Sequence, residues 1–190
     1  MPLTQKLLLL FFAILFISLP LQSKDRWVLD KTLSSITFEL PVLLANNVKG
    51  TFDNIEGLVE IDTENQKNNK AIFSVALDSI DMNYTKYKDL LLGSVFFDAK
   101  NFPIALVDTK KFTYKNEQET TLVVDLSIKG TTQKVPLQIE VYHLADEVVQ
   151  IKTRLIFSRT AFNIGTGRWS STAVLRDKAT IQTNLFLFKE

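Results

Sequence analysis

Apolar residues recur at every second position over most of the chain after Trp27. A period of two is typical of β-strands with one buried face, because successive side chains of a strand point to opposite sides of the sheet. The apolar members of these alternating runs are Ile36, Phe38 and Leu40; Ala71, Phe73, Val75 and Leu77; Leu122, Val124, Leu126 and Ile128; Val135, Leu137, Ile139 and Val141; Val149, Ile151, Leu155 and Phe157; and Ala179, Ile181, Leu185 and Leu187. The pattern predicts that they share one interior.

Short polar stretches separate the alternating runs, at residues 46–47, 53–54, 63–70, 115–119, 129–131, 145–147 and 165–167. Most contain Asn, Asp or Gly, which favour turns. About eight strands at this spacing predict an all-β, antiparallel fold, either a barrel or a sandwich. Apolar residues at spacings of three and four predict one short helix over residues 83–93, with Gly93 at its end.

The first residues have the layout of a signal peptide. Lys6 precedes an apolar run over residues 7–19, interrupted only by Ser18, and a short segment ending at Ser23 follows it. The run is shorter than the roughly 20 apolar residues that a membrane-spanning helix needs. We therefore expect residues 1–23 to be a cleaved signal peptide and residues 24–190 to form one exported domain. Leu21 stands where a small residue is preferred before cleavage, so an uncleaved membrane anchor stays the alternative.

Composition excludes several classes of function. The chain has no cysteine, which rules out disulfides, thiolate metal sites, cysteine nucleophiles and a lipoprotein anchor. Lys6 is the only charged residue before Lys24, so the predicted mature chain carries 21 basic and 21 acidic residues. This balance provides no electrostatic footprint for nucleic acid or an anionic membrane surface. We expect neither nucleic acid nor a metal as partner.

Few residues offer catalytic chemistry. His143 is the only histidine and lies beside a turn. A catalytic triad would have to be built on it, and no nucleophile-elbow sequence accompanies it. Asp78 and Asp81 flank a strand end, where Asp commonly supports a turn. The glycines form no phosphate-binding loop, because none of their stretches leads from a strand into a helix. We expect no enzymatic activity and no cofactor.

Phenylalanine is abundant, with fourteen residues in the chain. The interior of an eight-stranded barrel is just wide enough to be filled by side chains or to hold one ligand. The inward faces therefore predict either a packed core or an apolar cavity. The residues expected to line such a cavity are Phe38, Leu40, Phe52, Phe73, Val75, Phe97, Leu106, Leu126 and Phe157, taken from one face of successive strands.

Four stretches, in this order, resemble the YceI-like family of periplasmic proteins. They are residues 27–30 with Ser34 and Phe38; residues 48–52; residues 96–98 with Phe102 and Pro103; and Gly130 with Thr132, Val135 and Leu137, followed by residues 158–164. The resemblance extends over nearly all of the predicted mature chain. It implies a lipocalin-like antiparallel β-barrel of about eight strands with one or two short helices, and a polyisoprenoid as the ligand.

The chain departs from the family at positions that could help to hold a polar head group. The family usually has His where this chain has Leu33 and Lys129, and an Arg-Asp segment with His around Tyr87, Lys88 and Leu90. The resemblance therefore implies an apolar tail more firmly than any particular head group.

Three functions remain open at this point. The first, which we expect, is a periplasmic carrier that holds a polyisoprenoid, quinone-like or other long-chain lipid in its barrel. Its candidate head-group contacts at the mouth are Arg159, Arg168 and Trp169, because Arg pairs with phosphate or carbonyl oxygens. A hollow barrel with an apolar mouth is also consistent with a homodimer.

The second function is a ligand-free envelope interaction module with a packed barrel, which binds another protein through a strand edge or residues 63–70. The third is an envelope enzyme that acts on an apolar substrate through Tyr84, Tyr87 or Asp89. A continuous cavity favours the first function, and a packed interior favours the second.

Overall fold

The computed structural model describes residues 24–43, 46–82 and 85–190. The strands are β1 (Lys24–Leu29), β2 (Ser35–Leu40), β3 (Val48–Phe52), β4 (Ile55–Asp62), β5 (Lys70–Ala76), β6 (Ile80–Asp81), β7 (Ile104–Asp108), β8 (Glu119–Ile128), β9 (Thr131–Ala145), β10 (Val148–Ser158) and β11 (Lys178–Lys189). The helical elements are α1 (Thr85–Leu92) and the short 3₁₀ turns η1 (Gln66–Asn68), η2 (Leu77–Ser79), η3 (Thr160–Phe162) and η4 (Gly167–Trp169).

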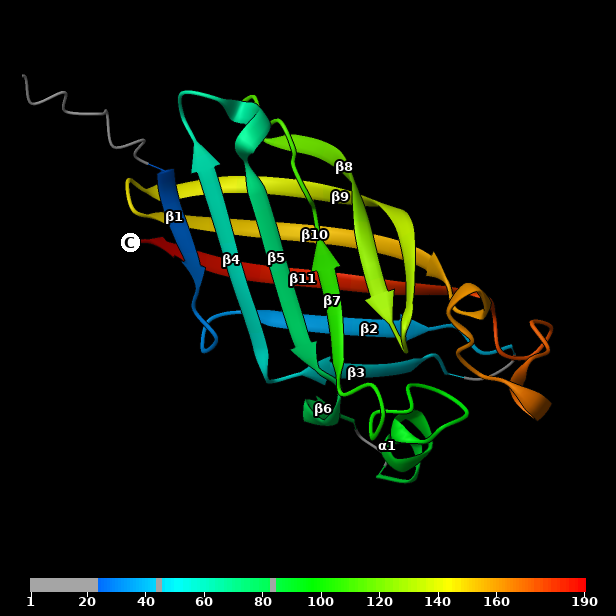
Figure 1. Ribbon diagram of the computed structural model, residues 1–190. Helices are drawn as coiled ribbons and strands as arrows, with labels where there is room; N and C mark the ends of the chain where they lie inside the picture. The colour runs from blue at the N-terminus through cyan, green and yellow to red at the C-terminus, as the bar shows by residue number, and fades with distance from the viewer. Residues whose placement is uncertain (1–23, 44–45, 83–84) are drawn as a thin grey trace, which may run out of the picture.

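The strands form one antiparallel sheet that closes into a barrel (Figure 1). Closure occurs where β1 pairs with β11, with Val28 opposite Phe188, while the other edge of β1 pairs with β4. The ring order is β1, β4, β5, β7, β8, β9, β10 and β11, which is eight strand positions within the described residues. The predicted all-β barrel of about eight strands is confirmed.

Three of the eight ring positions are each occupied by two consecutive strand segments. β11 pairs with β1 at its C-terminal end and with β2 over residues 180–184, so β1 and β2 share one position. In the same way β3 continues the position of β4, and β6 continues that of β5. A turn separates β1 from β2, in which the Asp30 carboxylate accepts hydrogen bonds from the backbone N–H groups of Thr32 and Leu33.

One face is buried in the strands that have a clear alternation, as the sequence predicts. In β2, Ile36, Phe38 and Leu40 are buried, whereas the intervening Thr37 and Glu39 are only half-buried. The long neighbouring strands β9 and β10 continue this pattern, and their buried residues lie side by side on the inner surface of the barrel. The core of the protein is therefore the inner surface of the barrel.

The two ends of the barrel differ in what covers them (Figure 1). The hairpin end has the start of β1, the connections at residues 63–69 and 109–118, and the turn at residues 146–147. The helix end has α1, the turn at residues 129–130 and the long β10–β11 connection at residues 159–177. The longest irregular segment and the only α-helix of the described residues thus lie together.

The predicted helix over residues 83–93 is present in most of its length. α1 covers Thr85–Leu92, and Gly93 follows it, with its N–H donating to the carbonyl of Asp89. Asn83 and Tyr84 lie outside the described residues. No helix in the described ranges has the length and apolarity that a membrane crossing requires.

The ladder around the ring is uneven. β10 and β11 pair over eleven residues each, from Val148 opposite Phe188 to Ser158 opposite Lys178. β7 and β8 pair over three, from Leu106 opposite Ser127 to Asp108 opposite Asp125. The connection at residues 109–118 joins β7 to β8 at the hairpin end.

The Asp177 carboxylate ties the two ends of the β10–β11 connection together. It accepts hydrogen bonds from Ser158 Oγ (2.9 Å), Thr160 Oγ1 (2.7 Å) and Thr160 N (3.2 Å). Burial alone raises the pKa of Asp177, but these hydrogen bonds outweigh burial and hold it below its ordinary value of 3.8. The folded protein thus stabilises the ionised carboxylate of Asp177 more than its protonated form.

We expect Asp177 to make the stability of the protein fall in acid. A depressed folded-state pKa contributes stability above the unfolded pKa, and this stability is lost as the pH falls through the folded-state value. Asp177→Asn should therefore lower the free energy of unfolding at neutral pH, and the difference from wild type should shrink below the ordinary value of 3.8. Urea unfolding of both proteins across the acid range measures this difference in the free energy of unfolding. A difference that does not change with pH would contradict the stabilising role of the ionised Asp177.

Candidate functional site

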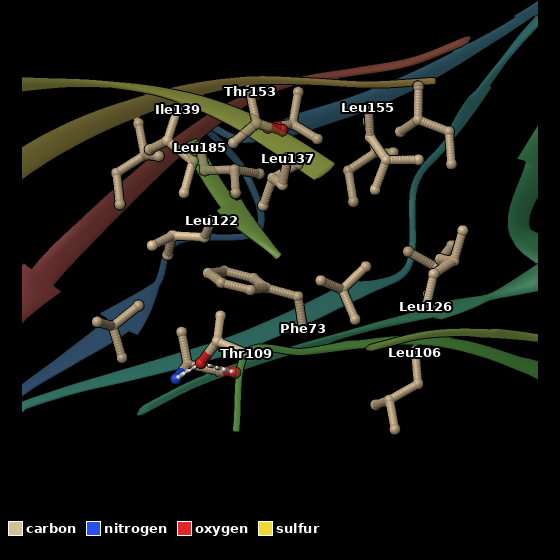
Figure 2. Close-up of a pocket in the computed structure, with 18 of the residues that line it drawn as sticks. Phe73, Leu106, Thr109, Leu122, Leu126, Leu137, Ile139, Thr153, Leu155 and Leu185 are labelled. Carbon is tan, nitrogen blue, oxygen red and sulfur yellow. Dashed lines mark hydrogen bonds between the residues drawn. The ribbon is translucent and has the colours of Figure 1, made fainter. Parts of the chain in front are cut away.

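The lumen of the barrel contains a cavity of about 510 Å³. Its walls are almost wholly aliphatic and aromatic side chains that come from every position of the ring. Figure 2 shows part of this wall, where Phe73, Leu122, Leu126 and Leu137 point into a common space. Ligand pockets of proteins commonly have volumes between about 300 and 1,000 Å³. The cavity is therefore large enough for a small organic ligand.

The hydroxyls of Thr109, Thr153 and Thr183 in the wall already have partners within the protein. The Thr153 and Thr183 hydroxyls, on neighbouring strands, lie 2.9 Å apart in a hydrogen bond. Thr109 Oγ1 accepts from the N–H of Ala71 (2.8 Å), and the hydroxyl also lies 3.2 Å from the Ala71 carbonyl (Figure 2). A ligand in this part of the lumen needs no polar group of its own, because none of these hydroxyls depends on it.

The cavity opens at the hairpin end, where its border becomes polar. This border, which we call the mouth, comprises Asp25, Thr63, Gln66, Lys115, Asn116 and His143. His143 faces the lumen side of β9, because it pairs with the buried Val149. Mixed charges and amides make the mouth wettable, while the lumen behind it is apolar.

Two further polar residues lie just inside the mouth. Burial and, to a lesser extent, the charge of Glu117 raise the pKa of Tyr114, so its phenol stays protonated at neutral pH. Asn69 is 1% exposed, and its Oδ1 accepts from the N–H of Asp62. Its Nδ2 has no hydrogen-bond partner among the described residues. A buried unpaired donor is costly, so the mouth carries one unsatisfied polar group.

The helix end of the cavity is closed. Leu91 of α1, Phe97 after it and Ile164 of the β10–β11 connection form the floor. Lys129, in the two-residue β8–β9 turn, joins these segments because its Nζ donates to the carbonyls of Ser94 (2.7 Å) and Asn163 (2.9 Å). Burial lowers the pKa of Lys129. The cavity is therefore a blind pocket with one mouth.

Arg159 also borders the cavity at this end, and 1% of its surface is exposed. An arginine side chain has five N–H donors, and here they make five hydrogen bonds, of 2.8 to 3.3 Å, to backbone carbonyls. The acceptors belong to Ile164, Gly165, Ser171, Leu175 and Arg176. The side chain thus holds the irregular connection in shape and has no donor left for a head group.

The other two predicted head-group residues lie at the same end. Arg168 and Trp169 belong to η4, and neither borders the cavity. The Trp169 ring packs against Phe96, with centroids 5.8 Å apart, and the Arg168 guanidinium carbon lies 5.4 Å from the Trp169 ring centroid. The structure therefore places the three residues predicted for the mouth at the opposite end of the barrel from it.

The predicted lining residues border one cavity, as the sequence pattern suggests. They are Phe38, Leu40, Phe52, Phe73, Val75, Phe97, Leu106, Leu126 and Phe157. Leu106 is a partial exception, because it pairs with Ser74 and Ser127 on the outer face of the sheet. Figure 2 shows its side chain on the far side of the strand from Phe73. Val107, which pairs with Phe73 and Leu126, takes the inward position. Ligand contact by these residues stays a prediction.

The positions where the chain departs from the YceI-like pattern lie away from the cavity wall. Leu33 is exposed in the β1–β2 turn, Lys129 lies in the β8–β9 turn, and Tyr87, Lys88 and Leu90 are on α1. None of these five borders the cavity. Asp89, the other described residue considered for catalysis, is exposed on α1 and does not border it either. None of the departures from the YceI-like pattern therefore lies in the cavity wall.

A closed barrel with an apolar lumen and a single polar mouth defines a class of small β-barrels that can enclose one apolar ligand. The YceI-like domain model matches residues 27–187, which is most of the chain. The chain therefore belongs to the YceI-like family. The resemblance predicted from four short stretches is confirmed.

Solved structures and sequence relatives are consistent with this assignment. The chain is similar to BcnA of Burkholderia cenocepacia, with a TM-score of 0.75, 23% identity, and coverage of 83% of this chain and 98% of that one. A polyisoprenoid binding domain from Saccharophagus degradans gives a TM-score of 0.68, 15% identity, and coverage of 86% and 98%. At these identities the likeness concerns the fold alone.

Among sequence relatives, a UPF0312 protein of Staphylococcus aureus strain USA300 is 29% identical over 115 residues. The match covers 60% of this chain and 64% of that protein. The chain thus spans less than two thirds of the length of the curated relatives that it matches.

We expect the Arg159 contacts to be essential for the stability of the helix end. Arg159→Lys keeps the charge but offers three donors, so at least two buried carbonyls lose their partner, at about 1–3 kcal/mol each. The free energy of unfolding should fall by about 3 kcal/mol, measured by urea denaturation. Arg168→Lys, a matched change on an exposed residue of the same connection, should alter it by less than about 0.5 kcal/mol. Equal stability of the two variants would contradict the structural role.

Proposed function

We propose that the protein binds one long-chain apolar lipid in the barrel lumen and acts as a carrier or sequestering protein for it. The observation that carries this proposal is the blind apolar cavity of about 510 Å³ with a polar mouth at one end. An apolar chain fits the lumen because the Thr153 and Thr183 hydroxyls bond to each other and Thr109 bonds to the backbone of Ala71. A more polar part of the ligand would remain at the mouth, near Tyr114 and His143.

The physical driving force is the removal of apolar surface from water. Burial gains roughly 25 cal/mol per Å², so a chain enclosed by the lumen gains affinity along its whole length without catalytic groups. This supports a binding protein in preference to an enzyme. Among the described residues the proposed catalytic groups Tyr87 and Asp89 lie on α1, away from the cavity wall.

We favour a polyisoprenoid or quinone-like lipid as the ligand class. The support is the family assignment together with the fold likeness to a protein described as a polyisoprenoid binding domain. The cavity also favours ligand binding over the alternative of a packed interaction module, because that alternative requires a filled barrel.

Leu122 and Val123 provide a matched test of lipid binding. Leu122 faces the cavity and pairs with the buried Leu137, whereas Val123 is 65% exposed on the outer face of the same strand. Protein purified from an exporting host is extracted with organic solvent, and the extract is analysed by mass spectrometry. Wild type and Val123→Glu should contain a near-stoichiometric long-chain lipid, and Leu122→Glu should lose most of it, because a carboxylate in the lumen opposes the apolar chain.

The fold of each variant is checked by circular dichroism and thermal unfolding. Leu122 lies near the hairpin end of β8, so water can reach the new carboxylate and the barrel should persist. Absence of lipid from wild type, together with failure to take up added prenols, would favour the interaction module instead.

We further propose that the carrier works in the periplasm after export. Support comes from the order of Lys6, the apolar run at residues 7–19 and the short segment that ends at Ser23. Expression of the full chain in a Gram-negative host should give a periplasmic protein whose first residue is Lys24, as intact-mass measurement and Edman sequencing can show. Retention of residues 1–23 in the membrane fraction would favour the anchor over the cleaved signal peptide.

A further inference from the structure

Asn69 places a side-chain amide in the wall of the cavity, just inside the mouth. It lies directly before β5, two positions from Ala71, which is buried and borders the cavity. Because side chains two positions apart in extended backbone point to the same side, Asn69 continues the inward face of β5. Asn69 also borders the cavity, and 1% of its surface is exposed. The amide is therefore part of the inner wall and is shielded from bulk water.

Only the acceptor end of this amide has a partner among the described residues. Asn69 Oδ1 accepts a hydrogen bond from the N–H of Asp62 at 2.8 Å, which fixes the orientation of the amide. Its Nδ2 has no hydrogen-bond partner in that part of the chain. The neighbouring Ala71 N–H, by contrast, donates to Thr109 Oγ1 at 2.8 Å (Figure 2). Since a buried donor without a partner is costly, an acceptor atom that a ligand brings to Nδ2 gains binding free energy.

A second donor borders the cavity on the segment next to Asn69. Phe112 forms a β-bridge with Asn69, and its N–H donates to the Asn69 carbonyl at 3.0 Å. Tyr114 follows two positions later and borders the same cavity. Burial and the charge of Glu117 raise the pKa of Tyr114, so its phenol keeps its proton at neutral pH. The two side chains thus offer an N–H and an O–H on one side of the mouth.

The fixed charge beside Asn69 disfavours an anionic head group. Asp62, whose N–H is bonded to Asn69, also borders the cavity. Hydrogen bonds from the Asn68 side chain and from the backbone N–H groups of Asn65 and Glu64 lower the pKa of Asp62. Its carboxylate is therefore ionised at neutral pH. An anion at Asn69 Nδ2 would lie close to this negative charge, and like charges brought together oppose binding.

The cavity wall provides little positive charge to offset this effect. Among the described residues that line it, the basic side chains with a full charge are Lys115 at the mouth and Arg159 at the closed end. The donors of Arg159 are all engaged by backbone carbonyls. At the mouth, Lys189 is paired with Asp25 at 2.8 Å. A phosphate head group would thus lose its hydration without an arginine to replace it.

We propose that Asn69 is the head-group donor of the cavity and that it selects an uncharged head group with an acceptor oxygen, a carbonyl or a hydroxyl, over a prenyl diphosphate. The oxygen accepts from Asn69 Nδ2, with Tyr114 as a second donor beside it. The inference rests on the proposed lipid-binding function and adds to it the chemical class of the head group.

The test compares ligands that share a farnesyl tail and differ in their head group. β-Farnesene has no oxygen, methyl farnesoate has an ester carbonyl, farnesol has a hydroxyl, and farnesyl diphosphate has a charged head. Their affinities for the delipidated protein, purified from an exporting host, are measured by displacement of the uncharged fluorophore phenylnaphthylamine. The common tail keeps the apolar contribution to affinity nearly constant along the series.

In wild type we expect methyl farnesoate and farnesol to bind at least as tightly as β-farnesene. An oxygen normally resists entry into an apolar site, and the Asn69 donor compensates for its lost hydration. Farnesyl diphosphate should bind at least about tenfold more weakly than farnesol, because of the Asp62 charge. Diphosphate binding as tight as that of farnesol would overturn the selectivity. Failure of all four ligands, β-farnesene included, would instead count against the proposed function itself.

Asn69→Leu removes the donor with little change in side-chain size. Relative to β-farnesene in the same variant, methyl farnesoate and farnesol should each bind about tenfold more weakly than in wild type. General damage to the barrel would weaken all three ligands alike and leave these ratios unchanged. Asn68→Leu is the matched control, because the Asn68 amide donates to Asp62 at 2.9 Å but does not border the cavity. Ratios that stay at the wild-type values in Asn69→Leu would contradict the role of Asn69.

A second measurement uses the wild-type protein. Heteronuclear NMR follows the signals of the Asn69 side-chain amide during titration with each ligand. A hydrogen bond to the ligand oxygen should shift one amide proton downfield with methyl farnesoate, and β-farnesene should not produce this shift. Should Asn69→Leu fail to fold, this comparison still decides the matter. Equal shifts with the two ligands, or none with either, would overturn the proposal.

Discussion

The barrel depends on the short ladder between β1 and β11, because these two strands turn an open sheet into a ring. The ladder comprises Trp27 to Leu29 opposite Lys189 to Leu187. Closure removes the free sheet edges and gives the apolar faces of all strands a common inside. Once the ring is closed with eight positions, its diameter is fixed. The diameter and the size of the inward side chains then determine whether side chains alone fill the interior. Here they do not, and a cavity of about 510 Å³ remains.

The asymmetry between the two ends makes this cavity a pocket. At the helix end, the buried Arg159 and the partly buried Lys129 donate hydrogen bonds to backbone carbonyls of the irregular connections. These bonds replace the strand and helix hydrogen bonds that irregular backbone lacks. At the hairpin end the connections leave polar side chains around an opening. One end of the lumen is therefore closed, and the other has a polar opening. A ligand can enter only from the hairpin end.

Much of the fold could be predicted from the sequence, because half-buried strands produce an alternation of apolar and polar residues that is visible in the sequence alone. The prediction for Leu106 was imperfect for a physical reason. Residues 104–107 are all apolar, and Ile104 is 49% exposed, so neither face of β7 is marked by polarity. Only the pairing with Phe73 shows that Val107 points inward.

The mouth could not be predicted in the same way. Tyr114 lies in an irregular connection that has no period. His143 continues the inward alternation of Ile139 and Val141, but its polarity and its place beside a turn concealed this. Arg159 was predicted as a head-group contact at the mouth, since arginine is mostly exposed in proteins. Its burial depends on backbone carbonyls of the following connection that converge on it, and side-chain identities do not reveal carbonyl directions.

The uneven ladder has a consequence for how fast a ligand can leave. β7 and β8 share three paired residues, against eleven for β10 and β11, and the long connection beside the mouth joins them. With β2 counted, the closure on β11 has eight paired residues, so β7–β8 is the shortest seam of the ring within the described residues. Strand pairs with few hydrogen bonds separate at lower free energy. A lipid held along its length would otherwise have to slide out through the mouth against its whole buried surface. In the proposed carrier we therefore expect the β7–β8 seam to govern the residence time of the lipid and the lumen to govern its affinity.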